Sequence, residues 1–427
     1  MKIITLDEQQ FDTFAKNHKY SNYYQTSSYG KTMKENGFNI HYLGLKDDSN
    51  QIIGASLIIY KEIFIGKKIA YAPRGILINY KDRPLLQEMA QKLKQVLGKQ
   101  GFLILRMDPY ILATIRNKNG KVINMNKDIN DIMKNIKSAS FKYKGQNKFF
   151  ENELPRYEAI CPLNEDLRII FKNLSKRTRH KINRAVGCGI TIFNDKEKNI
   201  NKLYEFIKDK TQLSKKYIED LIKNYETSNI YFAVLNTDSF VIEAKKRYEQ
   251  ELEKNDQLAT KIQIIRQKID TIKSKYLNAK MESDKLINTY KKDLVLATEL
   301  LKKYPEGFII GAALTIEHND TSNFIIDGFD KKYSHLNCTY LIKWFIINEA
   351  KKKELKYVNF NAIVGEFKKQ NPYKQLNELK LGLNTIPTEY IGEFELILNK
   401  FNYTLYKNFS KEKNYKLKNE LTKKEEK

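Results

Sequence analysis

Apolar and polar positions follow two repeats along the chain, and together they predict short strands and amphipathic helices. Apolar side chains three or four residues apart predict helices, whereas runs of β-branched and aromatic residues predict strands. Helices are expected at 11–17, 29–36, 83–100, 128–136, 164–173, 174–185, 204–210, 216–225 and 337–353. Strands are expected at 41–46, 52–62, 68–71, 102–110, 158–162, 186–193, 230–235, 308–316, 324–329 and 357–360. Both halves of the chain repeat this mixture, so we predict an α+β fold.

One long stretch departs from this mixture. Residues 241–303 contain neither glycine nor proline, and their apolar residues recur at alternating steps of four and three. Two series are present: Leu258, Ile262, Ile265, Ile269, Ile272 and Tyr276, followed by Leu286, Tyr290, Leu294 and Ala297. This spacing is typical of the seam of a coiled coil, and Pro305 and Gly307 end the second series.

The strands that flank this stretch predict how it runs. If residues 230–235 pair with residues 308–316, the chain between them must leave the sheet and return to it. We therefore predict an antiparallel helical hairpin at 237–303, called the arm below, with its tip between Arg266 and Asp284. The alternative is a single long helix that joins two unrelated domains.

The repeated order of elements also predicts a division into domains. Residues 1–155 are expected to form a first α+β domain, which residues 390–427 complete. Residues 156–236 and 304–389 are expected to form a second domain of the same kind, interrupted by the arm. A chain of 427 residues is long enough for two such cores.

The composition indicates which kind of partner and which cellular compartment to expect. The formal net charge is +25, which favours a polyanionic partner, although lysine that fills surfaces in an AT-rich genome is the alternative explanation. The three cysteines show no metal-binding or disulfide spacing, so we expect no metal and a reducing compartment. No apolar stretch reaches the ~18 residues of a membrane span, so we expect a cytoplasmic protein, at most in peripheral contact with the membrane.

Two places carry candidate chemistry. Asp108 follows a buried strand and precedes proline, where it is either a substrate-binding group or general base, or a cap or turn residue. The predicted helix at 174–185 is strongly basic, with Arg177, Lys181 and Arg184 on one face and Arg179 beside them. That face suits phosphate groups, and the alternative is a solvated surface. The segment 331–340 lacks the glycines of a coenzyme A loop, so we expect no such cofactor.

Several stretches, taken in order, resemble the Fem family (FemABX) of peptidoglycan bridge-forming aminoacyltransferases. Residues 24–34 are similar to the Gln-Ser-x-x-Trp entry of the family, with Tyr29 in place of tryptophan. Residues 102–110 resemble its strand ending in Asp-Pro, and 174–190 its basic helix. Residues 340–350, around Trp344, and the closing stretches 379–382 and 389–394 complete the series. The resemblance implies two GNAT-like domains with an antiparallel coiled-coil arm inserted in the second.

The resemblance also implies a reaction and the residues that serve it. An amino acid would pass from aminoacyl-tRNA, the co-substrate, to the stem-peptide amine of lipid II or UDP-MurNAc-pentapeptide. Asp108 would bind or deprotonate this amine, and Lys380 would stabilise the developing negative charge. Lys34 or Lys31 would contact precursor phosphate, and Tyr217 would line the acceptor cleft. The arm, with its lysines, would lie against tRNA, or would mediate contacts within a homo- or hetero-oligomer or a membrane complex.

Two departures from the family pattern leave room for a changed acceptor or for lost activity. The arginine expected four residues before Tyr217 is Leu213, so Lys215 or Lys216 would have to take its place. The Tyr-Asp-Phe-x-Gly stretch has Asn359 in place of the acid and Ala362 in place of the glycine. The competing class is a non-catalytic nucleic-acid-binding or scaffold protein that uses the arm for interaction and needs neither Asp108 nor Lys380.

Overall fold

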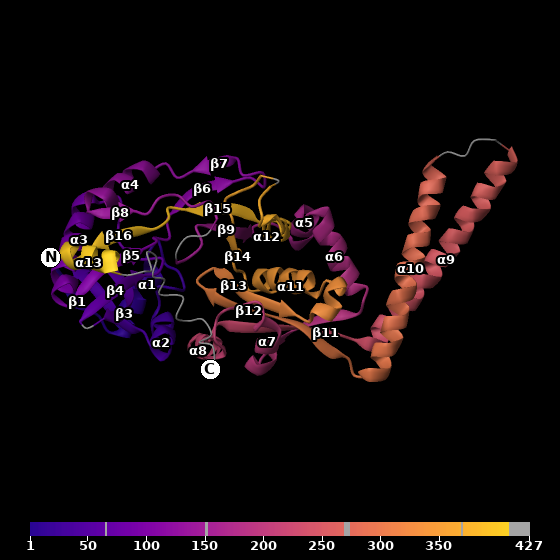
Figure 1. Cartoon of the computed structure of the whole chain (residues 1–427), viewed down its shortest axis with the longest axis horizontal. Coiled ribbons are helices and arrows are strands. Elements are labelled where there is room, and N and C mark those ends of the chain that lie inside the picture. Colours follow the sequence, from indigo (N-terminus) through magenta and orange to yellow (C-terminus); the bar gives the residue numbers. More distant parts are fainter. Residues whose placement is uncertain (65, 150–152, 269–273, 369, 410–427) are drawn as a thin grey trace.

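The chain folds around two mixed sheets (Figure 1), as the α+β prediction requires. The computed structural model describes residues 1–64, 66–149, 153–268, 274–368 and 370–409. The first sheet has the order β1-β2-β3-β4-β5-β16-β8. Its strands are β1 (Lys2–Thr5), β2 (Asn39–Lys46), β3 (Ile52–Phe64), β4 (Lys67–Ala72), β5 (Phe102–Met107), β16 (Phe394–Ile397) and β8 (Phe141–Tyr143).

The second sheet has the order β10-β11-β12-β13-β14-β9-β15-β6-β7. Its strands are β10 (Ile190–Asp195), β11 (Ser228–Leu235), β12 (Phe308–His318), β13 (Thr321–Phe329), β14 (Tyr357–Ile363), β9 (Tyr157–Pro162), β15 (Ile386–Tyr390), β6 (Leu112–Arg116) and β7 (Val122–Met125). The two sheets exchange strands along the chain. The hairpin β6–β7 joins the second sheet although it follows β5, and β16 returns to the first sheet after β15.

Helices cover both faces of the sheets because each presents one apolar side. The helices α3 (Arg83–Lys99) and α4 (Ile129–Ser138) pack on one face of the first sheet. On its other face lie α1 (Glu8–Asn17) and α2 (Ser27–Glu35), which share one core with α7 (Ile200–Ile207) and α8 (Lys215–Asn224) of the second sheet. The far face of the second sheet carries α5 (Leu167–Asn173), α6 (Lys176–Val186) and α11 (Cys338–Lys352). The remaining described helices are η1 (Lys331–Leu336), α12 (Lys374–Leu381) and α13 (Lys400–Phe409).

Each sheet contains one parallel pair of strands among otherwise antiparallel neighbours. In the first sheet β4 runs parallel to β5, and in the second β13 runs parallel to β14. The second pair is hydrogen-bonded only from Thr321–Asn323 to Tyr357–Asn359, after which the two strands separate. The ends of these two parallel pairs are therefore places where neighbouring strands separate.

The predicted pairing of the strands that flank the arm is confirmed, because β11 and β12 are antiparallel neighbours. Two long helices, α9 (Thr237–Lys268) and α10 (Ser274–Lys303), project from this pair (Figure 1). Their contacts join Arg247 to Tyr290 and Lys261 to Tyr276, so the helices run antiparallel. Helices of this length reach about 45 Å. The range predicted for the tip, Arg266 to Asp284, includes the end of α9, the start of α10 and residues 269–273, which lie outside the described residues.

The contact between α9 and α10 is more polar than its apolar series predicts. Ile262 is buried, as expected, but the polar residues Glu251, Asn255 and Ser283 are buried as well. The amide of Asn255 donates to Ser283 Oγ at 3.0 Å and to Asp284 Oδ1 at 2.9 Å. A hydrogen-bonded polar pair inside a helix contact fixes which residues face each other.

Two further observations concern the helices. The helix expected from residue 164 begins at Leu167, because the Asp166 side chain caps it by accepting from the amide of Arg168. Among the described residues, none of the helices has the length and apolar character needed to cross a membrane.

Candidate active site

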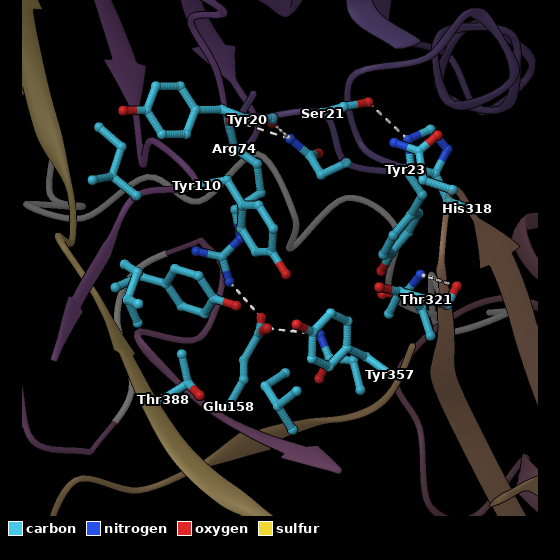
Figure 2. A pocket seen from close by; sticks show the side chains of 18 of the residues that line it. Tyr20, Ser21, Tyr23, Arg74, Tyr110, Glu158, His318, Thr321, Tyr357 and Thr388 are labelled. Atoms are coloured by element: carbon cyan, nitrogen blue, oxygen red, sulfur yellow. Dashed lines mark hydrogen bonds and ion pairs between the residues drawn. The ribbon is translucent and has the colours of Figure 1, made fainter. Parts of the chain in front are cut away.

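A cavity of about 690 Å³ lies where the two sheets meet. Its walls come from the loop before α2, the chain after β4 and β5, and the strands β9, β13, β14 and β15. Figure 2 shows the tyrosines and the polar side chains around this space. On the rim, Ser21 and His318 are hydrogen-bonded at 3.1 Å and join the two sheets. A small molecule or the end of a larger one fits a cavity of this size.

The cavity forms beside the two parallel pairs. The last paired residues of β4 and β5 are Ala72 and Met107, so Arg74 and Asp108 follow at the same edge. Asn359 is the last residue of β14 that pairs with β13. Side chains placed where neighbouring strands separate are not covered by the sheet itself. They are therefore available to line a cavity.

Arg74 connects the two sheets at the inner wall of the cavity. Its guanidinium donates to Glu158 Oε1 at 2.6 Å and lies 3.7 Å from Asp108 Oδ2. The rings of Tyr110 and Tyr390 are stacked on each other and lie beside it, with centroids 5.6 and 4.9 Å from its central carbon. Arg74, Asp108 and Glu158 are all buried. One cation thus holds two carboxylates that come from different sheets.

Asp108 lies behind Arg74, outside the residues that line the cavity. Its Oδ1 accepts from Tyr71 Oη at 2.9 Å and from the amide of Arg74 at 2.8 Å. Burial raises the pKa of Asp108 to about 7, although Arg74 opposes the rise. A carboxyl with such a pKa changes charge near neutral pH, which suits acid–base work. Asp108 contacts Arg74, which lines the cavity, but does not itself line it.

Lys380 lies on α12, and its ammonium donates to the carbonyl of Ala362 at 2.7 Å. Burial, with the charge of nearby Lys343, lowers the pKa of Lys380 to about 8. Lys343 is buried in an ion pair with Asp327 on β13. The negative charge of Glu158 acts in the opposite direction and favours the charged form of Lys380. A buried ammonium of this kind is suited to receive developing negative charge.

The fold brings together the other predicted substrate-binding residues, which are some 180 positions apart in the sequence. Lys31 and Lys34 lie exposed on α2, and Lys215, Lys216 and Tyr217 begin α8, which packs against α2. Lys216 donates to the carbonyl of Glu35 at 2.8 Å, and Lys31 pairs with Glu8 at 2.8 Å. Tyr217 is buried next to Tyr29, and burial raises its pKa to about 12. None of these five side chains lines the cavity.

The basic helix α6 has a different arrangement from the one its spacing predicts. Arg177 is 69% exposed, beside Glu378 at 3.4 Å. Lys181 donates to Tyr340 Oη at 3.1 Å, and Arg179 donates to the carbonyl of Leu174 at 2.7 Å. Arg184 pairs with Asp293 of α10 at 3.1 Å and so ties α6 to the base of the arm. Phosphate binding by this helix stays a prediction, with Arg177 its most open side chain.

Sequence reasoning assigned no role to Arg74 and Glu158. The stretch Pro73-Arg74-Gly75 after a strand and a charged residue inside a short buried strand were the available signals. Their partners come from other sheets and loops, so no spacing rule joins them. Among the described residues, no group of histidine, cysteine and carboxylate side chains has the arrangement of a metal site.

Comparisons with known proteins agree over nearly the whole chain. The model of the FemAB family matches residues 6–411. Aminoacyltransferase FemA of Staphylococcus epidermidis is 24% identical over 421 residues, which cover 96% of this chain and 99% of that protein. Aminoacyltransferase FemB of the same species is 25% identical over 426 residues, with coverage of 97% and 99%. The crystal structure of FemX has a similar fold, with a TM-score of 0.72 at 17% identity over 95% of this chain and 99% of that chain.

Proposed function

The chain belongs to the FemAB family and is an aminoacyltransferase, and we propose that it adds an amino acid to the stem-peptide amine of a peptidoglycan precursor during formation of interpeptide bridges. The donor is aminoacyl-tRNA and the acceptor is lipid II or UDP-MurNAc-pentapeptide. No further cofactor takes part, because the ester of the donor already carries the energy of the transfer. The observation that carries the proposal is the cavity between the sheets, whose wall includes the buried ion pair of Arg74 with Glu158.

The reaction asks little of the protein beyond alignment and electrostatics. The acceptor amine attacks the ester carbonyl, a carbon–nitrogen bond forms, and the bond to the ribose oxygen breaks. The proton lost by the amine ends on that oxygen. Lys380 stabilises the negative charge that develops on the carbonyl oxygen. Asp108 holds Arg74 at the cavity wall, and its direct contact with the amine, as the family resemblance implies, stays a prediction.

The anionic parts of both substrates find basic side chains outside the cavity. We propose that Lys31, Lys34, Lys215 and Lys216, at the contact of α2 with α8, bind the phosphates of the precursor. Arg177 on α6 faces the phosphates of tRNA. In this proposal the two sheets mark two GNAT-like domains, and α9 with α10 forms an antiparallel coiled-coil arm that lies against tRNA.

Transfer itself tests the proposed function. The full chain is mixed with tRNA charged with radiolabelled glycine, serine or alanine, and with lipid II or UDP-MurNAc-pentapeptide in separate reactions. We expect label to appear in one precursor from at least one charged tRNA, and none from the free amino acid. Absence of transfer in all combinations, by protein that melts cooperatively, would contradict the proposal in favour of a binding protein.

The arm provides a second prediction. Lys261, Arg266 and Lys275 are exposed on the outer half of α9 and α10. Their simultaneous replacement by glutamate is expected to weaken tRNA binding at least tenfold and to flatten its salt dependence, because each lost phosphate contact removes released counterions. Filter binding at several salt concentrations measures both. The matched control changes Lys245 and Lys292, which are exposed on the inner half, to glutamate. Equal weakening by both variants would contradict a role for the outer half.

A further inference from the structure

We propose that Glu158 is the binding site for a primary ammonium group of one of the two substrates. This inference rests on the proposed function and gives the carboxylate at the cavity wall a role in it. The carboxylate stands at the cavity wall, and Figure 2 shows it reaching toward Arg74 while the hydroxyl of Tyr110 points into the same space. Glu158 is buried, and its two oxygens accept from Arg74 and from Asn359.

Glu158 lies beside the position at which the family stretch carries an acid. That stretch has Asn359 in this chain in place of the aspartate. The amide of Asn359 donates to Glu158 Oε2 at 2.7 Å, from the strand that pairs directly with β9. The carboxylate at this place therefore belongs to β9, and Asn359 holds it in position.

The charges around Arg74 leave room for that cation. Arg74 is one buried cation between two buried carboxylates, Asp108 and Glu158. Above the pKa of Asp108, both carboxylates are ionised and Arg74 balances only one of them, and buried charges of this kind require a partner. Asp108 Oδ2 accepts no hydrogen bond from the described residues. An ammonium at Glu158 would supply the missing positive charge from the side of the cavity.

Glu158 also has the hydrogen-bonding capacity and the surroundings for an ammonium. Oε1 receives one donor from Arg74 and Oε2 one from Asn359, whereas a carboxylate accepts about four. The tyrosines Tyr24, Tyr110 and Tyr390 lie close enough for the Glu158 charge to raise their pKa values. Their rings line the same cavity, and aromatic faces attract ammonium groups.

Binding of small ammonium probes tests the inference without depending on transfer. Glycinamide represents the α-ammonium of the donor, and Nα-acetyl-lysinamide the side-chain ammonium of an acceptor. Each is compared with its fully acetylated form by saturation-transfer NMR. We expect one of the two probes to bind and its acetylated form not to bind, which also identifies the substrate that Glu158 receives. Failure of both probes to bind the wild-type chain would overturn the inference, whatever the transfer assay gives.

Two variants link binding to the carboxylate. Glu158→Gln is expected to lower the affinity for the bound probe about ten- to hundredfold, the effect of losing a hydrogen bond to a charged group. The double variant Glu158→Gln/Asn359→Asp returns the acid to β14 and should restore binding to within a few-fold of wild type. Unchanged binding in Glu158→Gln, or no recovery in a folded double variant, would overturn the inference. If Glu158→Gln does not fold, Glu158→Asp replaces it; withdrawal of the carboxylate by one methylene should weaken binding, and unchanged binding would count against the site.

Discussion

Lys380→Met is expected to lower the rate of aminoacyl transfer by about 10²–10³-fold, the usual effect of removing one donor that stabilises an oxyanion. Methionine keeps the length of the side chain and removes its charge. The ammonium of Lys380 donates to the carbonyl of Ala362, and this contact is lost in the variant. The rate is measured at saturating concentrations of both substrates, so that a change in binding does not hide the change in the chemical step.

The matched control is Lys374→Met, on the same helix but exposed and paired with Glu378 at 3.5 Å. This variant should transfer at the wild-type rate. The pH profile adds a second criterion. Because the pKa of Lys380 is lowered to about 8, its charge is present below this pH and is lost above it. The wild-type rate should therefore decline above pH 8, and the residual rate of Lys380→Met should lack this decline. A loss of less than about tenfold in Lys380→Met would exclude Lys380 from the chemical step.

The sequence predicted the regular elements well because their signals are local. The arm shows this most clearly: the absence of glycine and proline and the Pro305-Gly307 stop predicted a helix end near residue 303, and α10 ends at Lys303. The buried polar residues Asn255 and Ser283 were not predicted, because their hydrogen bond joins positions on separate helices. Local patterns locate a helix but do not show which polar residue finds a partner across a contact.

The candidate site was predictable only where a family motif or a strand end marked a residue. Asp108 was identified in this way, and so was Lys380, although neither lines the cavity. The sequence did not identify Glu158, because its role depends on contacts with Arg74 of the other sheet and with Asn359 of the neighbouring strand. The family comparison pointed to Asn359 as a loss. The pairing of β14 with β9 shows that an acid, Glu158, lies one strand away.

Arg74→Met is expected to lower the free energy of unfolding by about 3–5 kcal/mol at pH 8, because it removes one partner from a buried ionic group and leaves two carboxylates without it. The effect should reach across both sheets, since Arg74 binds Glu158 of β9 as well as Asp108 after β5. Urea unfolding followed by tyrosine fluorescence and by circular dichroism measures the loss. Arg177→Met, at an exposed pair with Glu378, is the control and should change stability little.

The loss in Arg74→Met should also depend on pH in a direction set by Asp108. The pKa of this carboxyl is raised from 3.8 to about 7, so between these values the folded chain binds more protons than the unfolded chain. The contribution of Asp108 to stability therefore falls as pH rises through this range. Arg74 opposes the rise in pKa, and its removal should extend the range upward. The variant should accordingly recover part of its stability at pH 5, and Arg74→Met/Asp108→Asn should recover part of it at pH 8. A loss that is the same at both pH values, and unchanged by Asp108→Asn, would mean that packing against Tyr110 and Tyr390, not charge, is what Arg74 contributes.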